Sequence, residues 1–246
     1  MPVSETLIIA ILFFVGAALY ASVGHGGASS YLAVMGLFSL APAVMKPTAL
    51  ALNILVAGIA TFKFYRAGLF SWRLLWPFAV ASIPAAFIGG ATMLPARAYK
   101  ILVGAVLLYA AVWMFRSSLR PLNKETHPPP LWAALAWGAA IGFLSGLTGV
   151  GGGIFLSPLL LYMGWAETRA TSGIAAPFIL VNSIAGLLGH FSSVALLPPG
   201  IPIWGAAAVI GGWIGASYGS KRAPAPVLRQ LLSLVLIVAG VKLIVY

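Results

Sequence analysis

The pattern of apolar and polar positions divides the chain into long apolar stretches, each typical of a membrane-spanning helix, with short polar breaks between them. Two of these stretches are interrupted by glycine clusters, Gly24-His25-Gly26-Gly27 and Gly149-Val150-Gly151-Gly152-Gly153, which lie half a chain apart. In a bilayer, a broken helix is tolerated only where it is buried in protein or lines a cavity. Paired breaks in two corresponding halves therefore point to the substrate site of a transporter.

Each interrupted stretch is too long to be one simple span. A single helix from Glu5 to Pro42 would be about 57 Å long, against about 30 Å for the hydrocarbon core of a bilayer. The stretch from Leu131 to Trp165 has the same character. We therefore predict that each stretch folds at its glycines into a helical hairpin.

The two halves of the sequence correspond element by element. After each glycine cluster comes a short apolar segment and then a basic residue two positions before a threonine, Lys46-Pro47-Thr48 in one half and Arg169-Ala170-Thr171 in the other. An apolar helix that contains an asparagine follows, and two more apolar helices close each half. The polar, proline-rich segment 117–130 separates the halves. We predict an all-α, polytopic transmembrane helical bundle of two inverted repeats, residues 1–116 and 131–246, each with a glycine-broken hairpin and three further spans.

The distribution of basic residues favours this topology. If both hairpins return to the side on which they began, ten basic residues fall on the linker side and four on the side of both termini; if each broken stretch crosses once, the numbers are seven and seven. The positive-inside rule then places the linker in the cytoplasm and both termini outside. The linker side holds Lys63, Arg66, Arg73, Arg116, Arg120, Lys124, Arg169, Lys221, Arg222 and Arg229, and the other side holds Lys46, Arg97, Lys100 and Lys242.

Composition defines the class of protein. Hydrophobic residues make up 61% of the 246 residues and charged residues 7%, against roughly a quarter charged in an average soluble domain. The chain is thus an integral, multi-pass membrane protein, and its first apolar stretch is expected to be a retained span. The net charge of +11 is attributed mainly to basic residues that flank spans, and it also suits positive vestibules for an anion.

The scarcity of reactive side chains excludes several functions. The chain has only three acidic residues, and this small number argues against a cation carrier, which needs buried carboxylates. There is no cysteine and there are three scattered histidines, so we expect no catalytic constellation, no metal site and no cofactor. We predict that the protein is not an enzyme and that it does not bind nucleic acid.

The glycine clusters are the predicted substrate site. Glycines allow sharp turns with exposed N–H groups, and a helix that begins there directs unpaired N–H groups and positive partial charge at the cavity. Second legs beginning at Ala28 and Ile154 would form a cradle for an anion near the middle of the membrane. Close helix packing is the competing interpretation of the glycines. The predicted substrate-binding residues are Gly24, His25, Gly26, Gly27, Ser29, Ser30, Thr48, Asn53, Thr148, Gly149, Gly151, Gly152, Gly153, Thr171, Ser172 and Asn182.

The side chains near the clusters each allow two interpretations. His25 either donates to an anion or carries a coupling proton, or it is a structural histidine bonded to a neighbouring carbonyl. The hydroxyls and amides either line the path or satisfy helix carbonyls and hold helices together. Lys46 and Arg169 either attract anions at the two mouths or are interfacial anchors that snorkel. The tryptophans expected in the interfacial belts are Trp72, Trp76, Trp132 and Trp204.

The second cluster carries a family resemblance. The run Ser145-Gly146-Leu147-Thr148-Gly149-Val150-Gly151-Gly152-Gly153, followed by Pro158 and the helix of Thr171, resembles the TauE/SafE family, described as sulfite or organosulfonate exporters. The first half departs from that pattern at His25, Ala28 and Ala33. The resemblance implies a membrane transporter, and export is expected from the resemblance alone.

These observations together predict a secondary transporter of the inner cell membrane that moves small sulfur-containing anions, sulfite or organosulfonates, by alternating access. An uptake carrier or a channel for another small anion is the alternative. A membrane enzyme and a purely structural subunit are the other classes. The expected partners are the small anion and the lipid bilayer, while the coupling ion and a homo-oligomeric state are left open.

Overall fold

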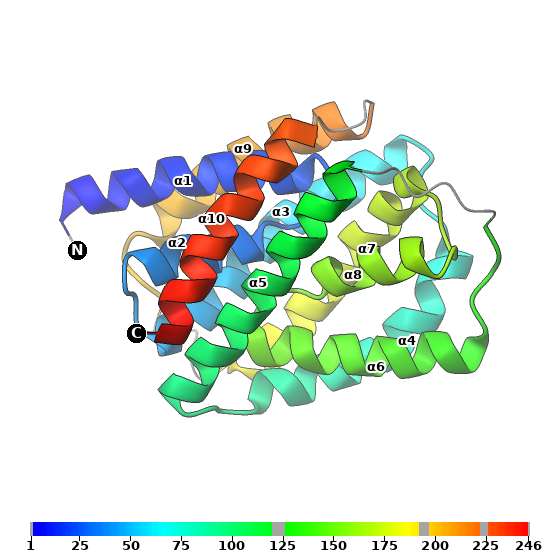
Figure 1. Cartoon of the computed structure of the whole chain (residues 1–246), viewed down its shortest axis with the longest axis horizontal. Coiled ribbons are helices and arrows are strands. Elements are labelled where there is room, and N and C mark those ends of the chain that lie inside the picture. The colour runs from blue at the N-terminus through cyan, green and yellow to red at the C-terminus, as the bar shows by residue number, and fades with distance from the viewer. Residues whose placement is uncertain (1, 120–125, 192–196, 222–225, 246) are drawn as a thin grey trace.

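The computed structural model describes residues 2–119, 126–191, 197–221 and 226–245, and these residues form ten helices and no strand (Figure 1). The prediction of an all-helical bundle is confirmed. The first half contains α1 (Val3–Ala21), α2 (Ala28–Leu37), α3 (Pro42–Arg66), α4 (Trp72–Ala91) and α5 (Ala96–Leu119). The second half contains α6 (Leu131–Thr148), α7 (Gly153–Tyr162), α8 (Thr168–Gly189), α9 (Ile201–Gly219) and α10 (Pro226–Val245).

The helix lengths are those of a multi-pass membrane protein. Seven of the described helices are long and apolar enough to cross a membrane. The helices α2 and α7 have 10 residues each, or about 15 Å, which is half the thickness of the hydrocarbon core. Helix α2 begins directly after the first glycine cluster, and α7 begins at Gly153, the last glycine of the second cluster and one residue before the predicted start at Ile154. The glycines therefore divide each long apolar stretch into a spanning leg and a short leg.

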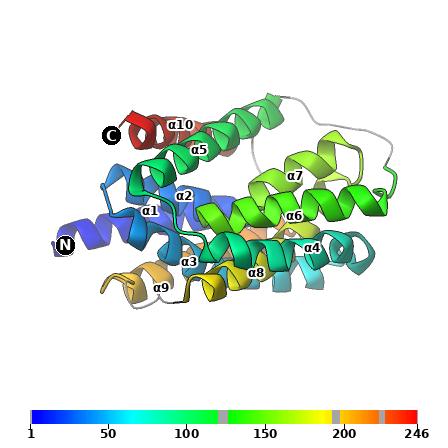
Figure 2. The same cartoon turned by 90° about the horizontal axis from the view of Figure 1, so that it is seen from below.

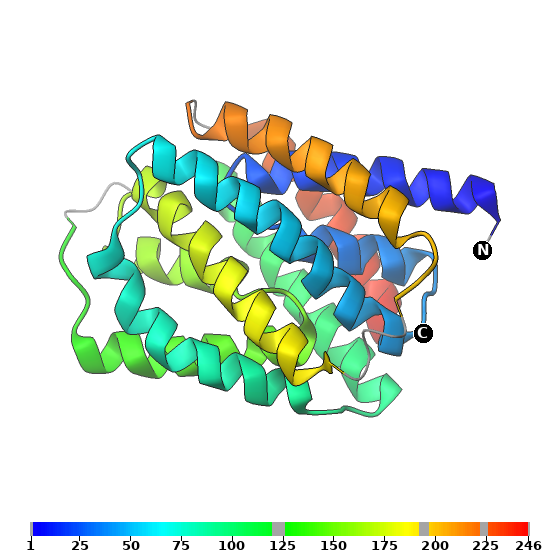
Figure 3. The same cartoon turned by 180° about the vertical axis from the view of Figure 1, so that it is seen from behind.

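Both termini lie at one end of the bundle, and the chain passes from α5 to α6 at the opposite end, which we call the linker end (Figures 1 and 3). In each broken stretch the short helix runs back toward the end from which the long helix came (Figure 1). The last turn of α3, with Lys63 and Arg66, lies at the linker end. Part of the predicted linker (residues 120–125, with Arg120 and Lys124) and Arg222 lie outside the described residues, as does the side chain of Arg229.

Helix pairs that join one half of the chain to the other hold the bundle together. Helix α4 packs along α6, and α1 packs along α9. In each pair one helix carries glycines at every fourth position, and a Cβ on any of them would collide with a backbone carbonyl of the other helix. Such small-residue faces allow close approach in membranes. The contacts are Gly138, Gly142 and Gly146 of α6 against Phe78, Ser82 and Ala86 of α4, and Gly211, Gly215 and Gly219 of α9 against Phe14 and Ala18 of α1 and Ser22 directly after it.

The remaining helices enclose the glycine clusters. Helices α5 and α10 lie side by side on one face of the bundle, and α3, α8 and α9 lie on the opposite face (Figure 2). The short helices α2 and α7 lie between these two layers (Figure 2). Both clusters are therefore inside the protein, which satisfies the requirement that irregular backbone at membrane depth is shielded from lipid.

The tryptophan prediction is confirmed in part. Trp72, Trp76 and Trp132 are exposed, as expected of residues that meet the lipid interface. The prediction is wrong for Trp204, which is fully buried and packs edge-on against Phe13 at a centroid distance of 5.4 Å. Its indole Nε1 donates to the carbonyl of Thr6 at 3.1 Å, so the ring fastens α9 to α1.

Candidate functional site

The first break turns the chain through two glycines in the left-handed region. Gly24 has φ 77° and Gly27 has φ 97°, conformations that L-residues with a Cβ rarely adopt. Gly24 also lies directly against the backbone of Ser172 in α8, where a Cβ has no room. The first cluster thus docks on the second half of the chain.

The second break is built in the same way. Gly149 has φ 84°, and Gly151 and Gly152 both have φ 83°. Gly149 lies against the backbone of Lys46 near the start of α3, at 3.2 Å from a Cβ position to the carbonyl oxygen. The second cluster therefore docks on the first half, and the two breaks make corresponding contacts in opposite directions.

The side chain of Asn53, in α3, joins the two breaks. Its Oδ1 accepts a hydrogen bond from the backbone N–H of Ala28 at 3.0 Å, which caps the start of α2. Its Nδ2 donates to the carbonyl of Val150 at 3.2 Å and to the hydroxyl of Ser183 at 3.3 Å. Gly26 and Gly151 both abut this amide so closely that a Cβ on either would collide with it. Asn53 thus positions both clusters, and both of its polar atoms are engaged.

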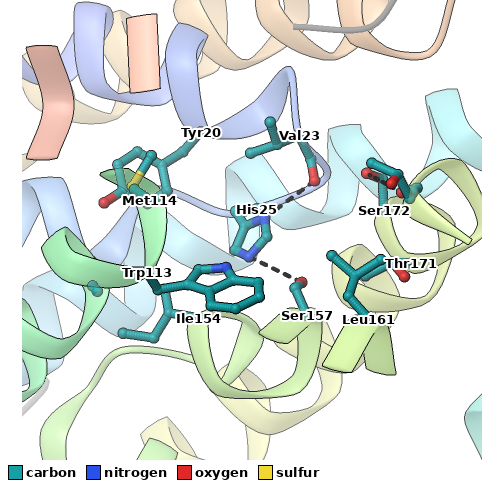
Figure 4. A pocket seen from close by; sticks show the side chains of 12 residues that line it. Tyr20, Val23, His25, Trp113, Met114, Ile154, Ser157, Leu161, Thr171 and Ser172 are labelled. Carbon is teal, nitrogen blue, oxygen red and sulfur yellow. Dashed lines mark hydrogen bonds between the residues drawn. The ribbon is translucent and has the colours of Figure 1, made fainter. Parts of the chain in front are cut away.

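A pocket of about 90 Å³ lies beside the first cluster, between α5 on one side and α7 and α8 on the other (Figure 4). Three of the predicted substrate-binding residues line it: His25, Thr171 and Ser172. The other lining residues were not predicted from the sequence, and they are Tyr20, Val23, Ala110, Trp113, Met114, Ile154, Ser157, Leu161 and Thr168.

His25 lies in the pocket and links the first break to α7. Its Nδ1 is 3.1 Å from the carbonyl oxygen of Val23, and its Nε2 is 3.2 Å from the hydroxyl of Ser157 (Figure 4). A carbonyl accepts hydrogen bonds and does not donate them, so Nδ1 carries a proton in this arrangement. Part of the side chain remains open to the pocket.

Two helix N-termini meet at this pocket. Ile154 belongs to the first turn of α7, and Thr168 begins α8. No side chain of the described residues caps either helix. The first N–H groups of a helix have no partner inside it and carry positive partial charge. The hydroxyl of Thr171, buried in the first turn of α8, has no hydrogen-bond partner among the described residues.

The other predicted polar residues lie outside the pocket. Three of them bond carbonyls near their own helix: Ser30 to Gly27 at 2.7 Å, Thr148 to Leu144 at 2.7 Å and Asn182 to Phe178 at 2.8 Å. The hydroxyls of Ser29 and Thr48 are buried, and that of Thr48 makes no hydrogen bond with the described residues. Gly152 and Gly153 pack against apolar side chains, of which Phe178 and Ile179 are the nearest.

The two basic residues expected at the mouths serve as helix caps. The ammonium of Lys46 donates to the carbonyls of Gly89, Gly90 and Thr92 at 3.3, 2.8 and 3.3 Å, where α4 ends. The guanidinium of Arg169 donates to the carbonyl of Ser220 at 3.0 Å, just after α9. Cations stabilise the unpaired carbonyls and the negative partial charge at a helix C-terminus. The prediction that Lys46 snorkels is wrong, because the residue is 4% exposed.

A histidine near Lys46 shares this environment. His190, which follows the last residue of α8, is buried. Burial, together with repulsion from the Lys46 ammonium, lowers the pKa of His190 below its ordinary value, although a hydrogen bond with the backbone of Gly90 opposes this. His190 is therefore neutral at physiological pH and adds no charge to this end of the bundle.

Comparison with known proteins identifies the family. The model of the family described as "Sulfite exporter TauE/SafE" matches residues 8–243. The chain is 44% identical over 244 residues to the "Probable membrane transporter protein y4hK" of Sinorhizobium fredii, covering 98% of this chain and 99% of that protein. It is 27% identical to the "Probable membrane transporter protein YjnA" of Bacillus subtilis, covering 96% and 98%. No solved structure gives a significant match. The chain therefore belongs to the TauE/SafE family and is a membrane transporter.

Proposed function

We propose that this protein is a secondary transporter of small sulfur-containing anions, sulfite or organosulfonates, in the inner membrane of the cell. The observation that carries the proposal is the pocket of His25. The first residues of α7 and α8, the hydroxyl of Ser157 and the imidazole lie at its wall, and Thr171 and Ser172 line it as well. None of its 12 lining residues is acidic.

The chemistry of the wall suits an oxyanion. Sulfite and sulfonate oxygens accept hydrogen bonds, and the pocket offers hydroxyls and helix N–H groups as donors. Neutral donors and helix partial charges contribute to anion binding without a lysine or arginine, a permanent cation, buried in the wall. The apolar wall of Trp113, Met114 and Leu161 is large enough to face the organic part of a small sulfonate.

An inverted repeat accounts for the packing of the bundle. The order of a long, a short and three long helices occurs in both halves. Corresponding helices make corresponding contacts: α4 with α6 and α9 with α1, α4 with α8 and α9 with α3, and α5 with α10. The odd number of spans after each hairpin turns the second half over. This organisation is the one that alternating access uses in many carriers.

The two halves differ in the packing of their short helices, and this difference suggests a mechanism. Helix α2 packs along α10, where Gly36 abuts Leu243 and the ammonium of Lys242 donates to the carbonyl of Leu37. In the other half the pocket lies between the corresponding helices α7 and α5. We infer from this difference that the site is open toward the linker end and closed toward the termini. When α7 closes on α5 and α2 separates from α10, the site opens to the opposite side. The family description supports export as the net direction.

Counterflow in proteoliposomes tests the proposal. Vesicles with purified protein are loaded with unlabelled methanesulfonate or sulfite, and entry of the labelled anion is followed. A carrier accumulates label transiently by exchange, and we expect this for sulfur anions and much less for acetate. Flux without exchange would indicate a channel. No flux of any sulfur anion, from protein that remains folded, would contradict the proposed substrate class.

A further inference from the structure

We propose that His25 carries a proton that binds and moves together with the anion. This inference rests on the proposed function, because it places the anion in the pocket of His25. Among the 12 lining residues, His25 is the group that changes charge near neutral pH; the phenol of Tyr20 ionises in water only near pH about 10. The proton is therefore the coupling ion that this pocket is equipped to bind.

The hydrogen bonds of His25 make its protonation a switch for the hydroxyl of Ser157. The Val23 carbonyl fixes the proton of the neutral ring on Nδ1, so Nε2 is an acceptor. The hydroxyl of Ser157, at 3.2 Å, then donates its hydrogen to Nε2 and is not available to an anion. When the ring takes up a proton from solution, Nε2–H becomes the donor and the Ser157 oxygen the acceptor.

Protonation thus prepares the pocket for an anion in two ways. The hydrogen of Ser157 is released to donate to a bound oxyanion, and the ring gains a positive charge beside it. Both changes strengthen anion binding, and by linkage a bound anion raises the proton affinity of His25 by the same factor. No bond is broken in the anion: one proton leaves the solvent and resides on Nε2.

The charged groups on the neighbouring helices are bound elsewhere or exposed, so they do not take over the proton-binding role of His25. On α1 the nearest titratable group is Tyr20, whose ring centre is 6.3 Å from the imidazole. On α8 the guanidinium of Arg169 is directed at the carbonyl of Ser220, and Glu167 is exposed before the first turn. On α3 the ammonium of Lys46 is bound at the end of α4. On α5 the basic residue beyond the pocket is Arg116, which is exposed.

Cotransport of one proton with a monovalent anion is electroneutral. The two then move in the same direction, so that the pH gradient adds to or opposes the concentration gradient of the anion. An anion concentration that is higher inside the cell drives protons out together with the anion. A proton concentration that is higher outside drives the anion in. Export therefore proceeds when the anion gradient exceeds the opposing pH gradient.

The test measures methanesulfonate binding by calorimetry between about pH 5 and about pH 9, a range that spans the pH at which imidazole groups ordinarily gain or lose a proton. Methanesulfonate is suitable because its charge is constant over this range. We expect Kd to rise up to about tenfold per pH unit on the alkaline side, with uptake of one proton per anion, seen as a dependence of the binding heat on buffer ionisation. Binding that is equally tight at all pH values, with no proton uptake, would overturn the inference while leaving the proposed function intact. No binding at any pH would count against the proposed function itself.

Variants locate the proton. His25→Gln is expected to bind the anion weakly and with no pH slope. Ser157→Ala retains Nε2–H as a donor, so its affinity falls while the slope remains. His127→Gln, an exposed histidine before α6, is the control and keeps the wild-type slope. A full slope in His25→Gln would overturn the inference, and if that variant does not fold, the proton uptake of the wild-type protein decides.

Discussion

Replacement of Asn53 by alanine is expected to destabilise the protein far more than the same change at Asn182. Both asparagines lie in the middle of long helices and both are 0% exposed. Asn53→Ala leaves the N–H of Ala28 and the carbonyl of Val150 without their partner, and both residues are buried. A buried polar group without a partner costs about 1–3 kcal/mol, so the expected loss is about 2–6 kcal/mol.

The matched control follows from the different bonds of Asn182. Its Nδ2 donates to the carbonyl of Phe178 in its own helix, and its Oδ1 has no partner among the described residues. A carbonyl inside a helix keeps its backbone partner, so Asn182→Ala is expected to cost about 0.5–1.5 kcal/mol, the net value of one hydrogen bond. Helix propensity favours alanine equally at both positions.

The assay compares both variants with the wild type by unfolding in mixed detergent micelles and by anion binding. Asn53→Ala should lower the free energy of unfolding by the larger amount and raise the Kd of the anion, because the two clusters lose their shared support. Asn182→Ala should leave the Kd close to that of the wild type. Equal destabilisation by both variants, or a larger effect of Asn182→Ala, would refute the role given to Asn53.

Three further predictions follow from the same contacts. Gly151→Val should abolish anion transport, because Gly151 has φ 83° and abuts the Asn53 amide. The control Gly58→Val should transport normally, because nothing lies within 4 Å of a Cβ at that position. Equal activity of the two variants in flux assays would contradict the proposed site. A disulfide between cysteines placed at Gly36 and Leu243 should block exchange of the anion and leave its binding from the linker end unchanged. The chain has no other cysteine that could interfere with the cross-link. Unchanged exchange after complete cross-linking would refute the proposed separation of α2 from α10. Lys46→Met should leave the Kd of the anion within about twofold, or about 0.4 kcal/mol, since its ammonium is bound to carbonyls outside the pocket, and a tenfold weaker Kd would show that it acts on the anion.

The breaks in the helices could be predicted from the sequence because their cause is local. A run of apolar residues that exceeds the bilayer thickness must fold back, and glycine is the residue that allows the turn. Positive φ values at Gly24, Gly27 and Gly149 are the direct outcome. The start of α2 at Ala28 is as predicted, and α7 starts at Gly153, one residue before the predicted Ile154.

The pocket was predicted only in part because it depends on contacts between distant segments. His25 was visible as a histidine inside a glycine cluster, but Trp113 comes from α5, whose place beside α7 no local pattern reveals. Ser157 carried a weak signal, a hydroxyl one turn into the short helix after the second cluster. The hydrogen bond between Ser157 and His25 joins the two halves of the chain and required the fold.

The two asparagines show the same limit. In the sequence each belongs to the long helix that follows the short apolar segment after a glycine cluster, so the two positions are equivalent by pattern. Asn53 comes five residues after Thr48, whereas Asn182 comes eleven after Thr171, so the two side chains occupy different levels of their helices. Only Asn53 reaches both clusters within the part of the chain that the structure describes. A similar long-range contact gives Lys46 the end of α4 as its partner.

The most direct test of the account is ligand-induced thermal stabilisation of the purified protein by sulfite, sulfate, sulfoacetate, taurine, methanesulfonate and acetate. A ligand that binds only the folded state stabilises it by about 2.7 kcal/mol at a concentration of about 100 times Kd. We predict that a sulfonate or a sulfur oxyanion raises the unfolding temperature, and that Gly151→Val, but not Gly58→Val, loses this shift. The absence of a shift with every anion, in protein shown to be folded, would contradict the central claim that the pocket beside the glycine clusters binds a small sulfur-containing anion.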